Sequence, residues 1–289
     1  MREMRIPIIT AVIVVTLLAF ISSLELVDTT ESQGLLHVTF LDVGQGDATL
    51  IESPTGTQVL IDGGKNGIVI GELKKTIGFF DRDIDMLVAT HPDMDHIGGL
   101  SDVLDQYDVA TILMTENIND TPAFNEFRSR IEAEGARIIY ARRGQIFDLG
   151  YGVHGSTTLS VLFPDHDPTN LESNMSSIVM QLEYGESTYI ITGDSPQEIE
   201  EYLVKLDGGE LESDILKLGH HGSKTSSAEL FITAVAPIFG IISAGKENSY
   251  GHPHKEVVDR LSAHGVIQKN TADEGSIFSV SDGVRIWFR

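Results

Sequence analysis

The chain has 289 residues, 41% of them hydrophobic, and a formal net charge of −23 at pH 7. Its length suits one large domain or two small ones, and the absence of cysteine excludes disulfides, thiolate zinc sites and a lipoprotein anchor. The acidic balance, which also suits a salt-adapted surface, argues against a broad basic groove for nucleic acid, although metal ions can neutralise a bound phosphate locally.

The N-terminus carries an almost wholly apolar segment over residues 6–24, preceded by Arg2 and Arg5 and followed by acidic residues. At about 1.5 Å rise per residue, a helix of that length can just span a hydrocarbon core of about 30 Å. Basic residues before the segment predict a cytoplasmic N-terminus and an extracytoplasmic remainder. We therefore expect residues 1–24 to form one hydrophobic helix, which is a membrane anchor or a cleaved signal peptide, and residues 25–34 to form a polar linker.

After the linker, residues 35–289 show the pattern of one mixed domain. Three short strands separated by Gly-rich turns come first, over residues 35–41, 48–52 and 58–61. A helix over 68–77 and a buried strand ending at Thr90 follow, and then helices alternate with strands. The second half repeats this order, with strands over residues 157–163, 177–184 and 188–192 before a second alternation. The pattern predicts an α/β (α+β) fold in which two mixed sheets pack face to face with helices outside, a four-layer αββα sandwich.

The densest group of metal-binding side chains follows the strand that ends at Thr90. His91, Asp93, Asp95 and His96 lie together in what reads as a loop. Imidazole with carboxylate suits zinc, manganese or iron, whereas a structural zinc site is normally closed by four ligands, often thiolates. The loop therefore predicts an open, hydrolytic site in which His91 and Asp93 serve one ion and Asp95 and His96 another. A loop of solvated polar residues is the alternative, and it leaves this concentration of ligands unexplained.

Asp194 is a second candidate ligand. It follows the strand over 188–192 and immediately precedes a predicted helix. An aspartate at such a position is more often a helix N-cap, but Ser195 and Pro196 can supply the cap here. Asp194 is then free to bridge two metal ions.

Two further loops offer histidines. His220 and His221 follow the strand over 214–218. Because adjacent side chains do not easily face one point, we expect His220 to be a ligand and His221 to pack nearby or contact substrate. His252 precedes a predicted helix, whose N-terminus attracts anions, so it could bind an oxyanion or donate a proton to a leaving group. The alternative for His252 is a plain helix-capping region.

Polar residues in Gly-rich turns complete the set of candidates. Asp42, Gln45 and Asp47 lie in one such turn, and they form either an Asx-type turn or a wall and outer support of the pocket. Asp62 ends a strand as Asp194 does, and it could orient a metal-bound histidine from outside the ligand shell.

These motifs together resemble those of the metallo-β-lactamase superfamily. The run over 91–99 is similar to its signature HxHxDH, and Asp62, Asp194 and His220 look like its further motifs. The chain resembles in particular the metallo-hydrolase domain of ComEC-type DNA-internalisation competence proteins. The segments that carry this resemblance are 42–47, 91–99, 191–194, 220–226 and 249–254.

The resemblance implies two divalent metal ions, zinc or manganese, held by His91, Asp93, Asp95, His96, Asp194 and His220. It implies metal-assisted hydrolysis, in which an ion lowers the pKa of a water toward about 7 and Asp95 orients that water. His252 and Lys224 would stabilise the oxyanion. Two departures from the family pattern make a weaker first site the expectation: Asp93 replaces a histidine, and residues 173–177 contain no histidine where many members carry a ligand.

We expect a hydrolase that cleaves phosphodiester bonds, as a nuclease does, outside the cytoplasm, with a nucleic acid or another phosphodiester as its substrate. Residues 6–24 would anchor it to the membrane or direct its secretion. ComEC-type proteins also carry a many-helix channel, so this chain, with one hydrophobic segment at most, is not expected to transport DNA by itself. The acidic surface favours an alternative, hydrolysis of another ester such as a phosphocholine ester, a small phosphodiester or a lactam. A non-catalytic, metal-stabilised binding module at the cell surface is the alternative from another class.

Overall fold

The computed structural model describes residues 34–289, and its secondary structure begins with strand β1 (Leu36–Phe40). The predicted hydrophobic helix over 1–24 and nearly all of the predicted linker lie outside the described residues. Among the residues that are described, no helix has the length and apolar character needed to cross a membrane.

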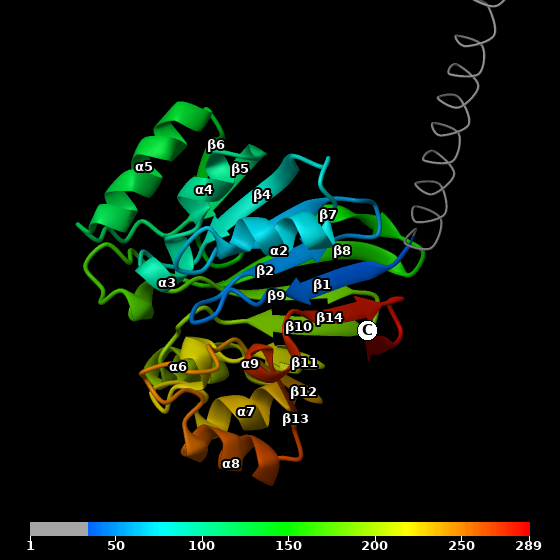
Figure 1. Cartoon of the computed structure of the whole chain (residues 1–289). Helices are drawn as coiled ribbons and strands as arrows, with labels where there is room; N and C mark the ends of the chain where they lie inside the picture. The colour runs from blue at the N-terminus through cyan, green and yellow to red at the C-terminus, as the bar shows by residue number, and fades with distance from the viewer. Residues whose placement is uncertain (1–33) are drawn as a thin grey trace, which may run out of the picture.

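Two β-sheets face each other at the centre of the domain (Figure 1). The strand order of the first sheet is β15 (Ile286–Phe288), β14 (Ile277–Ser281), β1, β2 (Thr49–Glu52), β3 (Gln58–Ile61), β4 (Asp83–Ala89), β5 (Asp108–Met114) and β6 (Arg137–Tyr140). The order of the second is β13 (Ile267–Asn270), β12 (Phe239–Ile242), β11 (Ile215–Lys217), β10 (Ser187–Ile191), β9 (Val179–Tyr184), β8 (Gly155–Phe163) and β7 (Ile146–Gly152). Strands β3 to β6 pair in parallel, as do β10 to β13, and the other neighbours pair antiparallel. Both sheets are therefore mixed, as the sequence predicts.

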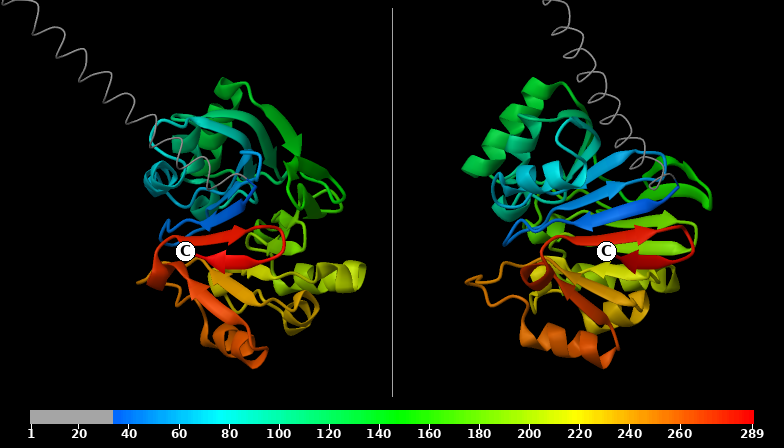
Figure 2. Two further views of the ribbon diagram at one scale, coloured as in Figure 1. Left: turned by 90° about the vertical axis from the view of Figure 1, so that its right-hand side faces the viewer. Right: turned by 45° about the vertical axis from the view of Figure 1, so that its right-hand side comes forward.

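Helices cover the outer face of each sheet (Figures 1 and 2). The first sheet carries α2 (Ile68–Thr76), α4 (Leu100–Leu104) and α5 (Pro122–Glu134). The second sheet carries α6 (Gln197–Asp207), α7 (Glu229–Val235) and α8 (Lys255–Ala263). Short helical turns lie in the connections: α3 (Met94–Ile97), α9 (Thr271–Glu274), η1 (Asn174–Ser176), η2 (Gly208–Leu211) and η3 (Gly219–Gly222). The predicted four-layer αββα sandwich is confirmed for the described residues.

Three apolar clusters hold the layers together. The central cluster lies between the sheets and includes Phe40 of β1 and Tyr189 of β10, both fully buried. The outer clusters join each sheet to its helices, through residues such as Phe127 of α5 and Phe231 of α7. Each buried aromatic side chain removes roughly 150–250 Å² from water, so burial of these residues stabilises the order of the layers.

Most predicted elements are present close to their expected ends. Helix α5 begins as predicted, because the hydroxyl of Thr121 accepts a hydrogen bond from the backbone N–H of Phe124. The sequence pattern does not predict β7 or β13, and the segment 94–97 forms a helical turn where a loop was expected. Of the two residues expected to supply the cap of α6, Pro196 is the N-cap, as predicted, whereas Ser195 is not and no side chain caps the helix.

The carboxyl ends of the parallel strands position the polar motifs. Strand β3 ends immediately before Asp62, and β4 ends just before His91. In the second sheet, β10 leads to Asp194 and β11 leads to His220. Ligands of α/β sheets bind outside such strand ends, so motifs that are far apart in the sequence can meet there.

Gly98 and Gly99 let the turn after α3 approach the loop after β3. A Cβ atom at Gly99 would lie 2.2 Å from the carbonyl oxygen of Gly63 and 2.6 Å from that of Asn66. We expect Gly99→Ala to lower the free energy of unfolding by about 1–3 kcal/mol, which is about 2–12 °C in Tm, as measured by thermal unfolding. Gly71→Ala is the matched control, because a Cβ there meets nothing within 4 Å and alanine should slightly stabilise helix α2. An unchanged Tm for Gly99→Ala would contradict this close approach of the two loops.

Candidate metal centre

Asp194 is the centre of a cluster of imidazoles at the strand ends. Its Oδ1 lies 3.1 Å from Nε2 of His96. Its Oδ2 lies 3.7 Å from Nε2 of His220, 3.8 Å from Nε2 of His221 and 4.0 Å from Nε2 of His91. The imidazoles come from the segments after β4 and β11, so the fold brings both histidine motifs to the carboxylate that was predicted to bridge two ions.

The atoms of this cluster are arranged as metal ligands would be. Two ligand atoms on one tetrahedral ion, each bonded at about 2.0–2.1 Å, lie about 3.3 Å apart, and the separations of 3.1–4.0 Å around Asp194 bracket that value. Nε2 of His91, Nε2 of His96 and Oδ1 of Asp194 are buried, yet none makes a hydrogen bond of good geometry. Buried polar atoms are costly without a partner. Because imidazole nitrogen and carboxylate oxygen suit divalent transition metals, the residues present fit a bound metal.

Asp93 and Asp95 approach different imidazoles: Asp93 lies beside His91, as predicted, whereas Asp95 lies beside His221, which was not its predicted partner. Oδ2 of Asp93 lies 3.8 Å from Nε2 of His91, while its Oδ1 accepts a hydrogen bond of 2.5 Å from the hydroxyl of Ser173. Oδ2 of Asp95 lies 3.2 Å from Nε2 of His221. One oxygen of Asp93 is thus already engaged, which is a physical reason to expect a weaker first site.

Both adjacent histidines face Asp194, so the expectation that only His220 would do so is wrong. The reason is the backbone of η3, in which His220 and His221 have φ values of 51° and 56°. This left-handed conformation is uncommon for residues other than glycine, and it brings both rings to one carboxylate. The side chain of His221 is 1% exposed, against 29% for that of His220. His221 therefore joins His220 as a candidate ligand and is the more enclosed of the two.

Two carboxylates contact the outer nitrogens of the imidazoles. Oδ2 of Asp62 lies 2.8 Å from Nδ1 of His96, and Oδ1 of Asp47 lies 3.2 Å from Nδ1 of His221. Contacts of this kind fix the ring orientation and raise the basicity of the nitrogen that faces a metal. Asp47 also has an oxygen within 4.8 Å of ligand atoms of Asp194, but its two oxygens are already bound to other side chains. Asp47 and Asp62 thus occupy the positions of orienting groups that the sequence suggests for them.

Lys217 is a buried cation that sequence reasoning missed. Its ammonium donates to Oδ2 of Asp47 at 2.7 Å and to the backbone carbonyl of Leu218 at 2.9 Å. Burial by itself would raise the pKa of Asp47, but Lys217 and His221 hold it well below its usual range. Asp47 is therefore kept as a carboxylate in place beside His221. The available signal was a lysine within the otherwise apolar run 215–218.

Asp42 and Gln45 have different roles: one forms the Asx-type turn and the other a wall of the pocket, which are the two interpretations that the sequence offers. Oδ1 of Asp42 accepts a hydrogen bond of 3.1 Å from the backbone N–H of Gly44, which is the Asx-type turn. Gln45 instead lines a cavity beside the metal centre. Residues 173–177 contain no histidine, but Asn174 borders the metal centre there: its Nδ2 lies 3.3 Å from Nδ1 of His220.

His252 and Lys224, which were expected to stabilise an oxyanion, lie in different surroundings. The ring centroid of His252 lies 5.5 Å from that of His220 and 6.1 Å from that of His221. Burial and then the neighbouring imidazoles lower the pKa of His252 to about 4, so at neutral pH it is an uncharged hydrogen-bonding group. Lys224 is exposed, and its role at the metal centre stays a prediction.

The charges in the cluster compensate one another. Burial by itself would raise the pKa of Asp194, but His96 and His221 hold it well below its ordinary value. Burial would likewise lower the pKa of His96, but the carboxylates of Asp194 and Asp62 raise it well above its ordinary value. The site thus favours ionised carboxylates that are balanced by positive charge, and a divalent cation would supply that charge.

Asp62→Asn should weaken metal binding by about 10–100-fold, which is the usual cost of losing a group that orients a metal-bound histidine. Asparagine keeps the size of the side chain but removes the negative charge 2.8 Å from His96. Affinity would be measured by competition with a chromogenic chelator. Asp42→Asn serves as the matched control, because Asp42 bonds a backbone N–H and no imidazole. Equal affinities for the two variants would argue against an orienting role for Asp62.

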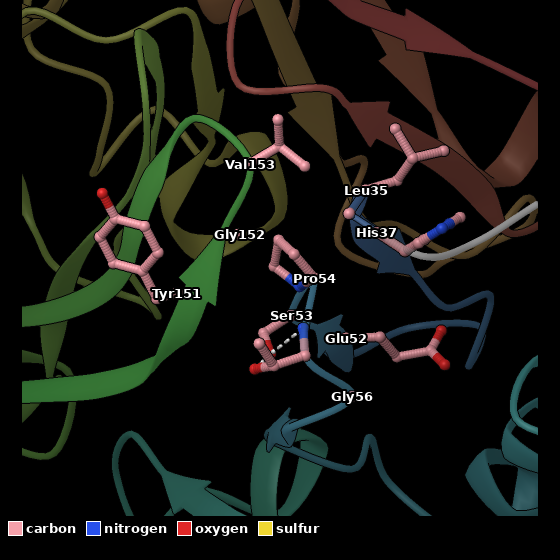
Figure 3. Close-up of a pocket in the computed structure, with 11 residues that line it drawn as sticks. Leu35, His37, Glu52, Ser53, Pro54, Gly56, Tyr151, Gly152 and Val153 are labelled. Carbon is pink, nitrogen blue, oxygen red and sulfur yellow. Dashed lines mark hydrogen bonds between the residues drawn. The ribbon is translucent and has the colours of Figure 1, made fainter.

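Two cavities bear on where a substrate could bind. A cavity of about 900 Å³ lies where the chain enters the described domain, and Leu35, Glu52 and Tyr151 are among its lining residues (Figure 3). It contains none of the residues of the metal cluster. A second cavity, of about 470 Å³, is lined by Asp95 and Tyr250. The smaller cavity is therefore the one from which a substrate could reach the cluster.

The chain matches the Metallo-beta-lactamase superfamily over residues 41–245. It is 31% identical over 259 residues to ComE operon protein 3 of Bacillus subtilis (strain 168), an alignment that covers 83% of this chain and 32% of that protein. It is 30% identical over 241 residues to Competence protein ComA of Neisseria gonorrhoeae, covering 83% of this chain and 31% of that protein. The chain thus spans about a third of the length of these curated relatives.

Among solved structures, the fold is similar to that of the metallo-beta-lactamase fold protein YhfI from Bacillus subtilis. The TM-score is 0.52 at 12% identity, over 82% of this chain and 95% of that one. Sequence and fold agree with the resemblance that the motifs carry. The chain belongs to the metallo-beta-lactamase superfamily of metal-dependent hydrolases.

Proposed function

We propose that this protein hydrolyses phosphodiester bonds of nucleic acid, with two divalent metal ions, zinc or manganese, held at the cluster around Asp194. The observation that carries the proposal is the buried carboxylate of Asp194, which four imidazoles face. Two further carboxylates lie beside these imidazoles, Asp93 near His91 and Asp95 near His221. Paired metal sites with a shared carboxylate are suited to stabilising both oxygens of a displacement at phosphorus.

We assign metal-binding and proton-transfer roles to the following residues. His91 and Asp93 would hold one ion. Asp95 and His96 would hold the other, with His220 and His221 both near enough to Asp194 to join them. Asp194 would contact both ions. Bound ions would supply Lewis acidity and a water of lowered pKa. The side chain of Asp95 is 30% exposed and lines the cavity of about 470 Å³. It can therefore orient a water and accept its proton at the place where a substrate would enter.

The relatives support nucleic acid as the substrate class. One of them is named Competence protein ComA, and another, from Haemophilus influenzae, is named Recombination protein 2. The net charge of −23 favours a second candidate, a small or short phosphodiester, because long DNA would be repelled by the acidic surface.

Cleavage assays on the full-length protein would test this proposal. With manganese or zinc supplied, we expect cleavage of labelled single- or double-stranded DNA, and Asp95→Ala should lose at least about 100-fold, as expected for an essential proton-transfer group. A chromogenic phosphocholine ester and a β-lactam would be run in parallel. If DNA stays intact while one of these is cleaved, the nuclease proposal fails and the other ester is the substrate. Tight DNA binding with no hydrolysis by any preparation would instead indicate a binding module.

We propose further that the catalytic domain lies outside the cytoplasm, because the basic residues before the predicted segment 6–24 favour that orientation. A C-terminal alkaline phosphatase fusion should then be active in cells, since that reporter folds only outside the cytoplasm. Activity of a cytoplasmic reporter such as green fluorescent protein at the same position, with an inactive phosphatase, would refute the orientation.

A further inference from the structure

We propose that Tyr250 and Lys65 form a subsite that stacks a nucleobase and contacts a phosphate next to the bond being cleaved. This inference rests on the proposed function and adds to it a preference for unpaired nucleotides. Its first support is location. Tyr250, Lys65 and Asp95 line the same cavity of about 470 Å³, a volume within the range of small-molecule sites, about 300–1,000 Å³.

The ring of Tyr250 is connected to the metal centre through another ring. It lies nearly parallel to His252, with centroids 5.6 Å apart and an interplanar angle of 23°. His252 in turn lies next to the rings of His220 and His221, at 5.5 and 6.1 Å. Tyr250 is nevertheless 62% exposed, so much of its surface is free to meet a ligand. An aromatic surface so near the metal cluster is well placed to stack the base beside a phosphodiester.

The loop that presents Tyr250 is held in place before any ligand binds. Nδ2 of Asn248 donates to the backbone carbonyls of Gly245 and His252, at 2.8 and 2.6 Å, and its Oδ1 accepts from the backbone N–H of His252 at 2.9 Å. Oε1 of Gln45 accepts from the backbone N–H of Gly245 at 3.1 Å. These bonds close the loop on itself and fasten it to the turn after β1. Little conformational entropy would be lost on binding, which favours affinity.

Lys65 supplies the charge that a phosphate requires. It is exposed, and its ammonium makes no hydrogen bond or ion pair within residues 34–289. Lys65 is the basic residue among those that line this cavity, and in a protein of net charge −23 its positive charge beside the metal cluster favours an anion there. Asp95 and Glu247 line the same cavity, so Lys65 is the side chain there that can attract a phosphate.

Stacking on Tyr250 requires a base whose face is free. In a duplex both faces of each interior base are covered by neighbouring bases, so only single-stranded or end nucleotides can use the subsite. Loss of a base–aromatic stack costs about 1–3 kcal/mol, which converts to a rise in KM of about 5–150-fold at 1.4 kcal/mol per tenfold.

The test compares two oligomers of equal charge. One is a fluorescein-labelled hexathymidylate, and the other is the same backbone with abasic tetrahydrofuran residues in place of every nucleoside. With the full-length protein and manganese, we expect Tyr250→Ala to raise KM for the hexathymidylate by about 5–150-fold and so to remove the preference over the abasic oligomer. Tyr250→Phe, which keeps the ring, should retain that preference. Lys65→Gln should raise KM for both oligomers and lessen the dependence of KM on salt.

Tyr151→Ala is the matched control, because Tyr151 is 75% exposed but lines the other cavity. An unchanged KM for Tyr250→Ala, or an equal rise for both oligomers, would overturn the stacking subsite. If the wild-type protein cleaves neither oligomer, the proposed function fails instead, and fluorescence anisotropy then decides the subsite. Weaker binding of the hexathymidylate by Tyr250→Ala would support it, and equal binding by both proteins would reject it.

Discussion

Asp194→Asn is expected to abolish metal-dependent hydrolysis and to reduce the metal content of the purified protein. Asp194 lies within 3.1–4.0 Å of four imidazole nitrogens, so both proposed ions depend on its charge. Asparagine preserves the shape of the side chain but offers one neutral oxygen. Groups that only orient a ligand are worth about 10–100-fold, and the loss of a shared ligand should exceed about 100-fold in activity.

Metal content would be measured by inductively coupled plasma mass spectrometry alongside the hydrolysis rate. Asp282→Asn is the matched control, because Asp282 lies in the β14–β15 turn and its carboxylate accepts hydrogen bonds from the backbone N–H groups of Val284 and Arg285. The control should keep its metal and its activity. Two ions per chain in the Asp194→Asn protein would show that Asp194 does not bridge them.

Removal of metal with a chelator is expected to lower the Tm of the wild-type protein by about 5–10 °C. A ligand present at 100 times its Kd stabilises the folded state by about 2.7 kcal/mol, and about 2–4 °C per kcal/mol applies to a domain of this size. The physical reason is that Nε2 of His91, Nε2 of His96 and Oδ1 of Asp194 are buried and make no hydrogen bond of good geometry, so a bound ion would satisfy them. Re-addition of manganese or zinc should restore the Tm.

The same measurement on Asp194→Asn provides the control for this effect. A metal bound to the cluster predicts a much smaller shift for the variant than for the wild-type protein. A shift of equal size in both proteins would place the stabilising ion elsewhere, and no shift in either would contradict metal binding at the cluster.

Much of the fold could be predicted from the sequence, because central strands and the inner faces of helices are buried and leave a regular apolar pattern. The strands that the pattern does not predict, β7 and β13, are the outer strands of the second sheet. An edge strand has one neighbour and buries little: β7 has one fully buried residue, Leu149, and β13 has none. Neither strand therefore shows an alternation of buried and exposed residues. The edge strands of the first sheet, β6 and β15, also bury no residue, but their short apolar runs, Ile138-Ile139-Tyr140 and Ile286-Trp287-Phe288, mark them in the sequence.

For the candidate site, the sequence by itself determined which residues could be ligands. The groups at 91–96, Asp194 and His220 stand out because each follows a strand that must end there, and the fold does bring them together. Asp62 was also recognisable as a group that could orient a histidine, and it contacts His96. Strand ends are local features, so their residue types can be read without knowing the fold.

Only the tertiary structure decided how these residues are oriented and which side chains they contact. His221 faces Asp194 because two consecutive residues adopt left-handed backbone angles, a conformation that residue type does not reveal. Lys217 and Asp47 form a buried pair across 170 positions of the chain, and no local pattern relates them. Contacts of this range depend on how the two sheets pack, so the chain indicates candidate ligands at strand ends, whereas their partners, their orientation and the place of His221 depend on the tertiary structure.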